Sequence, residues 1–325
     1  MKVDEISSLL NKFRNCIVHF PRFNAAHSIL LNAIEDTNTS GEPYGAILCA
    51  KSGVGKTTLC FQVMGQFKEK YSAEVEGGVD LCASVIYFEV PSEVTIKGMP
   101  RKMLIALGIE NPKGSTEEMT QQLIHLLKQR RVELVFLDEI NRLCVGTAKK
   151  IRPQTLGWIA SFINALGKPV IISGTEECVD IRRHLDSFAT RFPYQVNMEF
   201  FSYSEDPSSE YIRTLQKLDE AISTITKLNG EINIHDPAIA LNLYLATAGN
   251  LGWLRKVLFV ALKRCLLRDD GKGLKLADFH YACELLSLDT RLTPGNPFSL
   301  DPMNSFKFLY SKDVQSKIQE FRITP

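Results

Sequence analysis

The stretch Gly45–Cys60, "GAILCAKSGVGKTTLC", decides the fold. A short apolar run leads into a loop that matches G-x-x-x-x-G-K-S/T, except that Ala50 stands at the first glycine position. In such loops successive backbone N–H groups surround a phosphate. Gly53 and Gly55 can adopt the positive φ that this turn requires, and an alanine at position 50 costs little if its φ stays negative. The pattern predicts a phosphate-binding loop between a buried strand and the N-terminus of a helix.

The residues of this loop have distinct expected roles. Lys56 is placed to reach the β- and γ-phosphates, and the Thr57 hydroxyl is placed to bind magnesium. The residues that we expect to contact the nucleotide are Ser52, Gly53, Val54, Gly55, Lys56, Thr57 and Thr58.

Composition places the chain among ordinary globular proteins. It has 325 residues, 45% hydrophobic and 23% charged, which is enough for two domains. The net charge of +1 excludes a global basic field, so any DNA contact must come from local patches. The eight cysteines form no C-x-x-C pair, and several lie in apolar runs, where a thiol acts as a small hydrophobe. With neither a signal-peptide core nor a membrane-length apolar run, we expect a cytoplasmic protein.

Apolar strand-like runs alternate with helical patterns through the first two thirds of the chain. The expected strands are 46–50, 84–90, 134–138, 169–173 and 194–200, and the expected helices are 56–71, 96–107, 116–130 and 154–166. This alternation predicts an α/β domain, residues 41–205, with a parallel sheet covered by helices on both faces. A helical segment, residues 1–40, precedes it.

The last third of the chain is helical in pattern. Ser209 and the pair Asp236-Pro237 are helix start signals, and together with two further helices they predict a small all-helical domain over residues 206–288. The segment 289–325 is rich in Pro, Asn and Ser, and we expect an extended tail.

A second nucleotide motif is "ELVFLDEI", Glu133–Ile140. Apolar residues form a strand that ends in Asp138 and Glu139. A carboxylate at the end of such a strand can hold Mg²⁺, directly or through water, which is the role we expect for Asp138. Glu139 beside it can polarise a water for attack on the γ-phosphate.

The strand "PVIISGTEE" should lie beside the Asp138 strand. Ser173 and Thr175 are both candidates to orient the attacking water, and Thr175 is preferred because it lies just past the strand.

Two arginines complete the expected hydrolytic site. Arg191 in "SFATRFPYQV" follows a helix and precedes a strand, a position from which ring-forming ATPases point an arginine into the neighbouring subunit's site. Arg182 and Arg183 are rivals for this role. Arg255, on a helix of the small domain, can reach the γ-phosphate.

These motifs in this order resemble an AAA+ ATPase, and more closely the TniB/TnsC family of transposition regulators. The segments "FPRFNAAHSILLNAI", "FEVPSEVTIKGMPRKMLIALGIENP", "VFLDEINRL" and "VIISGTEEC…LDSFATRFPYQV" are similar to that family's pattern, over about residues 15–200. The chain departs from the pattern at Ala50, and at Asn141, where His or Gln is expected. The resemblance implies an AAA+ P-loop NTPase fold with a helical lid behind it.

The resemblance also implies a function. Such proteins bind ATP with Mg²⁺ and assemble as homo-oligomeric rings or helical filaments on duplex DNA, independently of its sequence. They connect a TniQ-type target-selection protein to the transposase, and ATP hydrolysis regulates the assembly.

Local cations could supply the DNA contacts. One candidate patch is Lys97, Arg101 and Lys102, and the other is Arg142, Lys149, Lys150 and Arg152. Both segments leave the same edge of the predicted sheet, and a ring would repeat them around its pore. Such phosphate contacts are independent of sequence and sensitive to salt. Two other functions stay open from the residues, a helicase-loader-type replication ATPase and a signalling NTPase that does not bind DNA.

Overall fold

The computed structural model describes residues 3–68, 84–144, 148–228 and 230–322. The chain divides into two compact units. We call Arg22–Ser52 with Lys56–Met198 the α/β unit, and Met1–Pro21 with Gly53–Gly55 and Glu199–Ile323 the helical unit.

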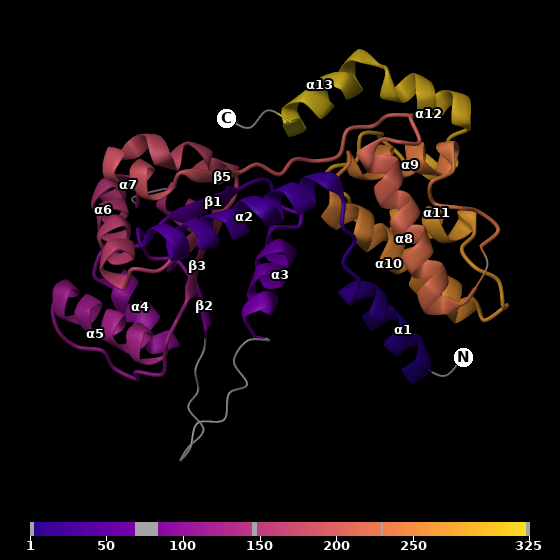
Figure 1. The fold of residues 1–325 in the computed structure, drawn as a ribbon. Helices are drawn as coiled ribbons and strands as arrows, with labels where there is room; N and C mark the ends of the chain where they lie inside the picture. The colour runs from indigo at the N-terminus through magenta and orange to yellow at the C-terminus, as the bar shows by residue number, and fades with distance from the viewer. Residues whose placement is uncertain (1–2, 69–83, 145–147, 229, 323–325) are drawn as a thin grey trace. The chain divides into compact units, whose positions relative to one another are not determined.

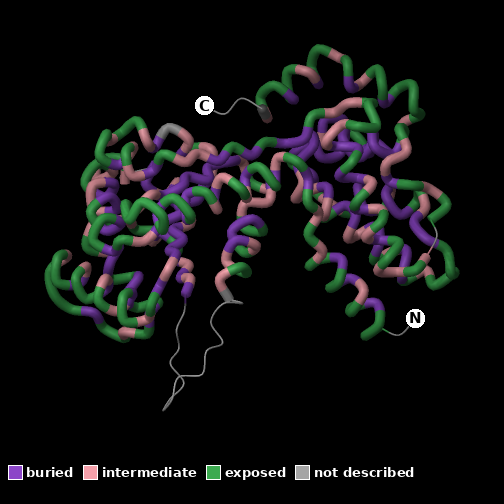
Figure 2. The backbone as a smooth tube through the Cα atoms, viewed as in Figure 1, coloured by how far each residue is buried: buried purple, intermediate pink, exposed green. Residues whose placement is uncertain are grey.

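The α/β unit is built on a parallel sheet. In the described part of the chain it has five strands in the order β2-β3-β4-β1-β5. The strands are β1 (Gly45–Cys49), β2 (Val85–Glu89), β3 (Leu134–Asp138), β4 (Val170–Gly174) and β5 (Tyr194–Val196). β1 and β4 are buried along their whole length, as expected for strands covered on both faces (Figure 2). The predicted parallel sheet is therefore confirmed.

In the α/β unit one helix precedes the first strand, and the others alternate with the strands in the predicted order (Figure 1). They are α2 (Pro21–Ser40), α3 (Lys56–Lys68), α4 (Gly98–Ala106), α5 (Thr116–Gln129), α6 (Ala148–Leu166) and α7 (Asp186–Arg191), with 3₁₀ turns η1 (Ile140–Leu143) and η2 (Glu176–His184). α5 begins at a capping box, because Glu118 N donates to Ser115 Oγ and Ser115 N donates to Glu118 Oε2. The predicted continuation of α3 to residue 71 lies outside the described residues.

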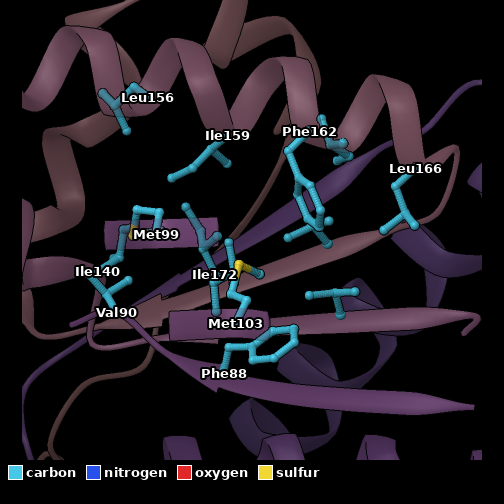
Figure 3. Packing of buried hydrophobic residues seen from close by; sticks show 14 of the residues in the cluster. Phe88, Val90, Met99, Met103, Ile140, Leu156, Ile159, Phe162, Leu166 and Ile172 are labelled. Carbon is cyan, nitrogen blue, oxygen red and sulfur yellow. The ribbon is translucent and has the colours of Figure 1, made fainter. Parts of the chain in front are cut away.

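Side chains alternate between the two faces of the sheet. Ile47, Leu137 and Ile172 belong to a core shared with α4, α5, α6 and α7. Figure 3 shows α6 lying over these strands and pointing its apolar side chains at them, namely Leu156, Ile159, Phe162 and Leu166. The alternate positions of the strands point to the opposite face, where Phe61 of α3 stacks on Tyr87 of β2 with ring centroids 6.2 Å apart.

The helical unit combines both ends of the chain. Its helices are α1 (Val3–Asn15), α8 (Glu210–Thr226), α9 (Pro237–Thr247), α10 (Leu251–Arg268), α11 (Leu276–Leu285), α12 (Pro302–Leu309) and α13 (Lys312–Arg322), with a 3₁₀ turn η3 (Pro297–Ser299). Ser209 caps α8 by accepting from Ile212 N, and Asn250 caps α10 by accepting from Trp253 N. The predicted helical region after the sheet is confirmed, and it belongs to one compact unit with α1.

The predicted extended tail is wrong for Pro302–Arg322, which is helical. The Asp301 side chain accepts hydrogen bonds from the first backbone N–H groups of α12, and a proline follows at the first helical position. Ser305 donates to Asn242 of α9 at 2.8 Å. Leu309, Val314 and Ile318 are buried, so a sparse apolar pattern is enough to fold the tail.

The cysteines follow the expected pattern only in part. Cys60, Cys144, Cys265 and Cys283 are buried free thiols, as small hydrophobes would be. Cys49 and Cys178, however, form a disulfide that joins the end of β1 to η2, which the sequence did not predict. No helix in the described ranges combines the length and the apolar character that crossing a membrane requires.

Candidate nucleotide-binding site

The phosphate loop has the backbone geometry that the motif predicts. Gly53 has φ +84° and Gly55 has φ +102°, both in the left-handed region that favours glycine. Ala50 does not adopt a positive φ, and its N–H donates to Gly174 O at 3.2 Å. The alanine at the first motif position is therefore compatible with the loop, as predicted.

Lys56 rests on the carbonyls of its own loop. Its Nζ donates to Ala50 O at 2.5 Å and to Lys51 O at 2.9 Å. Burial lowers the pKa of Lys56, and the carboxylates of Glu176, Asp138 and Glu139 oppose that shift. The ammonium is thus held where phosphate oxygens, which carry more negative charge than carbonyls, can replace its present partners.

Asp138 at the end of β3 is held by several donors. Ser173 Oγ of β4 donates to Oδ1 at 2.5 Å, and Glu139 N donates to the same oxygen at 2.8 Å. Tyr87 Oη of β2 donates to Oδ2. A carboxylate fixed in this way, with the Thr57 hydroxyl in the first turn of α3, supplies the oxygen donors that Mg²⁺ prefers.

Phosphate oxygens and water would have to complete the coordination of Mg²⁺. Within the described ranges, no group of three His, Cys, Asp or Glu side chains lies close enough to hold a metal ion. The donor set therefore fits a magnesium ion that arrives with a nucleotide, which is the usual way this ion is bound.

Glu139 has an unusual backbone. Its φ of 61° and ψ of 34° lie in the left-handed region, which is uncommon for a residue with a side chain and occurs often at functional sites. Its Oε2 accepts from Asn141 Nδ2 at 3.4 Å and lies 3.8 Å from Arg142 Nε. The side chain is 40% exposed, so a water molecule can reach the carboxylate.

Asn141 links the ends of two strands. Besides its contact with Glu139, its Oδ1 accepts from Thr175 N at 3.2 Å, just past β4. The Thr175 hydroxyl donates to Glu177, whereas the Ser173 hydroxyl contacts Asp138. The choice of Thr175 as the water-orienting residue stays a prediction, and Ser173 remains its rival.

The sequence identified neither Tyr87 nor a role for Asn141. Both act across strands, so their contacts depend on the register of the sheet. Tyr87 pairs with Phe136 in that register, two residues before Asp138 on the same face. Only a known alignment of β2 against β3 would have pointed to Tyr87.

The candidate arginines lie in different surroundings. Arg191 is the last residue of α7 and is half-buried. Arg182 Nε is buried without a hydrogen-bond partner in the described part of the chain, and Arg183 is exposed. Their contribution to a neighbouring subunit's site stays a prediction.

Arg255 of α10 contacts α1. Its Nη2 donates to Phe13 O at 2.8 Å and to Arg14 O at 3.2 Å, and its Cζ lies 5.2 Å from the centroid of the Phe13 ring. Burial lowers the pKa of Arg255. A contact with the γ-phosphate would replace these hydrogen bonds, and it stays a prediction.

The first candidate DNA patch lies at α4. Lys97 directly precedes this helix, while Arg101 and Lys102 lie within it, and all of these side chains are exposed.

The second patch divides into two kinds of residue. Lys149 and Lys150 are exposed in the first turn of α6. Arg152 Nε donates to Leu143 O at 2.9 Å, and its Nη1 lies 2.6 Å from His184 Nε2. Arg142 donates to a main-chain carbonyl and lies within ion-pair distance of two carboxylates, so it is held inside the unit. The two lysines are the freer candidates.

A phosphate loop after β1, an Asp-Glu pair at the end of β3, polar residues at the end of β4 and a helical unit in the same chain define an AAA+ ATPase. The family model described as "TniB: Bacterial TniB protein" matches residues 14–200, more than half of the chain. The protein therefore belongs to the TniB family. No curated protein matches it.

Solved structures agree on the fold. The chain is similar to the Aeropyrum pernix ORC1 protein in complex with DNA, with a TM-score of 0.58 and 16% identity over 93% of this chain and 78% of that one. Cdc6p from Pyrobaculum aerophilum has a TM-score of 0.55 and 15% identity over 84% and 69% of the two chains. The Aeropyrum pernix ORC2 protein has the same TM-score and identity over 86% and 72%. At such identities the likeness concerns the fold alone.

Proposed function

We propose that this protein is an ATP-dependent, DNA-binding regulator of transposition. It assembles on duplex DNA and links a TniQ-type target-selection protein to the transposase. The match to the TniB family over residues 14–200 carries this proposal, because it covers the phosphate loop, Asp138, Glu139 and Arg191 together.

The proposed reaction is hydrolysis of ATP to ADP and phosphate. The loop N–H groups and Lys56 bind the phosphates, and a Mg²⁺ ion bound with the nucleotide would supply further charge to neutralise the phosphate oxygens. Asp138 and the Thr57 hydroxyl would supply the protein's oxygen ligands to this ion. Glu139 orients a water molecule and accepts its proton during attack on the γ-phosphate. Arg191 stabilises the developing charge in the site of the next protomer.

The proposed DNA contacts come from exposed cations on α4 and at the start of α6. A net charge of +1 gives a single protomer little attraction for DNA, but a ring or filament would repeat the same cations along the duplex. The similar ORC1 structure from Aeropyrum pernix is itself a complex with DNA, so a DNA-associated role is compatible with this fold.

Assembly tests the proposal directly. Purified protein is examined by negative-stain microscopy with Mg²⁺ and ATP, with and without a long duplex. We expect rings or filaments that require ATP and become longer or more abundant on DNA. A chain that stays monomeric under all conditions would contradict the proposal. ATPase activity indifferent to DNA would favour a DNA-independent switch, and a preference for single-stranded or primed DNA would favour a replication loader.

The DNA surface has its own test. The double substitution Lys149→Glu and Lys150→Glu should weaken duplex binding about 10-fold or more, measured by fluorescence anisotropy with ATP present. The slope of log affinity against log salt should fall by about 2, since two phosphate contacts are lost. The matched control reverses Lys312 and Lys317, exposed residues of α13. Equal losses in both double variants would move the DNA path away from α6.

A further inference from the structure

Tyr87 lies on β2, the strand next to the one that carries Asp138. β2 and β3 are parallel, with Tyr87 paired to Phe136 and Glu89 paired to Asp138. Because side chains two residues apart share a face, Tyr87, Phe136 and Asp138 all point to the α3 side of the sheet. The register thus places a phenol beside the carboxylate at the end of β3.

The contacts of Tyr87 fix its hydroxyl on Asp138. Its Oη donates to Asp138 Oδ2. Its ring lies between two others, stacked on Phe61 of α3 and tilted against Phe136, each with centroids 6.2 Å apart. A phenol is protonated at neutral pH and can therefore donate this hydrogen bond to the carboxylate.

The opposite oxygen of Asp138 is held from the other side. Ser173 Oγ and Glu139 N both donate to Oδ1. A carboxylate offers about four lone-pair positions, so these bonds together with the one from Tyr87 fix its plane and leave few free positions. Removing the donor on Oδ2 alone would let the carboxylate rotate about its remaining contacts.

We propose that Tyr87 is a positioning residue that orients the Asp138 carboxylate toward the magnesium ion of a bound Mg²⁺–nucleotide. The proposal rests on the proposed ATPase function and adds to it a residue outside the nucleotide motifs. Partners that hydrogen-bond to a metal-ligating carboxylate commonly change metal affinity or activity about 10- to 100-fold when they are removed.

The test is Tyr87→Phe, which keeps the ring and removes only the hydroxyl. Binding of a fluorescent, slowly hydrolysed ATP analogue is titrated at increasing Mg²⁺ and, separately, in EDTA. We expect the Mg²⁺ concentration for half-maximal binding to rise about 10-fold, while affinity in EDTA stays within about twofold of wild type. ATP turnover at limiting Mg²⁺ should fall in parallel and recover partly at high Mg²⁺.

The control is Tyr310→Phe, an exposed tyrosine of the helical unit, which should change none of these values. The proposal would be overturned if Tyr87→Phe needed the same Mg²⁺ concentration as wild type for half-maximal binding, or a lower one. It would also be overturned if nucleotide affinity in EDTA fell as much as affinity with Mg²⁺, because that would indicate a purely structural role. A wild-type protein that binds no Mg²⁺–nucleotide would instead overturn the proposed ATPase function, and this proposal with it.

Discussion

Two cations that are expected to contact ATP rest on main-chain carbonyls in this structure, and they do so differently. Lys56 donates to Ala50 O and Lys51 O, within its own loop. Arg255 donates to the last carbonyls of α1, more than 200 residues away in the chain. An exchange of partners by Lys56 is therefore local, whereas an exchange by Arg255 would remove contacts that hold a helix.

The charges around the two cations differ as well. Burial lowers the pKa of both groups, but carboxylates of Glu176, Asp138 and Glu139 raise that of Lys56. For Arg255 the contribution that raises the pKa comes from Cys16, not from a carboxylate. Lys56 thus lies in a polar cluster suited to phosphate and metal, whereas Arg255 lies at an apolar contact between two helices. We therefore expect Lys56 to contribute to ATP binding itself, and Arg255 to couple ATP binding to the contact between α10 and α1.

The largest expected effect follows from Lys56→Ala. Loss of the charge-assisted contacts should weaken ATP binding about 100-fold or more and abolish assembly, measured by calorimetry and negative-stain microscopy. The matched control is Lys113→Ala, an exposed lysine of the same unit. Retained nucleotide binding would show that the loop is not the phosphate site, and the proposed difference between Lys56 and Arg255 would then be wrong.

Glu139→Gln should give the next largest effect. The amide cannot accept a proton from water, so turnover should fall about 100-fold or more while ATP binding is retained. The DNA-bound assembly should then persist, because ATP hydrolysis no longer drives its dissociation. Steady-state phosphate release and dissociation from labelled DNA measure the two effects, with Glu110→Gln as the control for loss of a carboxylate. Normal turnover would exclude Glu139 as the base.

Arg255→Ala should have the smallest effect on ATP binding and should also lower stability. We expect a loss of about 3- to 10-fold in ATP affinity and of about 1–2 kcal/mol in the free energy of unfolding, because the hydrogen bonds to α1 are lost. Lys263→Ala, on the exposed side of α10, is the control. If stability falls but ATP affinity does not, Arg255 is a structural clamp for α1 and has no role at the phosphates.

Much of the fold could be predicted because its signals are local. Apolar runs located the strands, with β3 at the predicted Leu134–Asp138, and helices begin at the predicted start signals Ser209 and Asp236-Pro237. The phosphate loop was readable for the same reason, since its residues are contiguous and its geometry depends on its own glycines.

The parts that the sequence did not reveal depend on contacts between distant segments. Tyr87 and Asn141 join the site only through the register of the strands and the path after β3. The disulfide between Cys49 and Cys178 spans a sequence separation of 129. The helices of the tail escaped prediction because their polar composition outweighed the start signal at Asp301, although a few buried side chains suffice to fix them.

The position of α1 has a consequence for biosynthesis. α1 is synthesised before α10, yet this helix, with Ile6, Leu10 and Phe13 buried, packs against α10, and Arg255 follows Phe13 by 242 residues. At a synthesis rate of about 5–20 residues per second, the apolar side chains of α1 would stay uncovered by α10 for roughly 10–50 s. We expect α1 of the nascent chain to be a target for chaperones during that interval, and the helical unit to fold after the α/β unit.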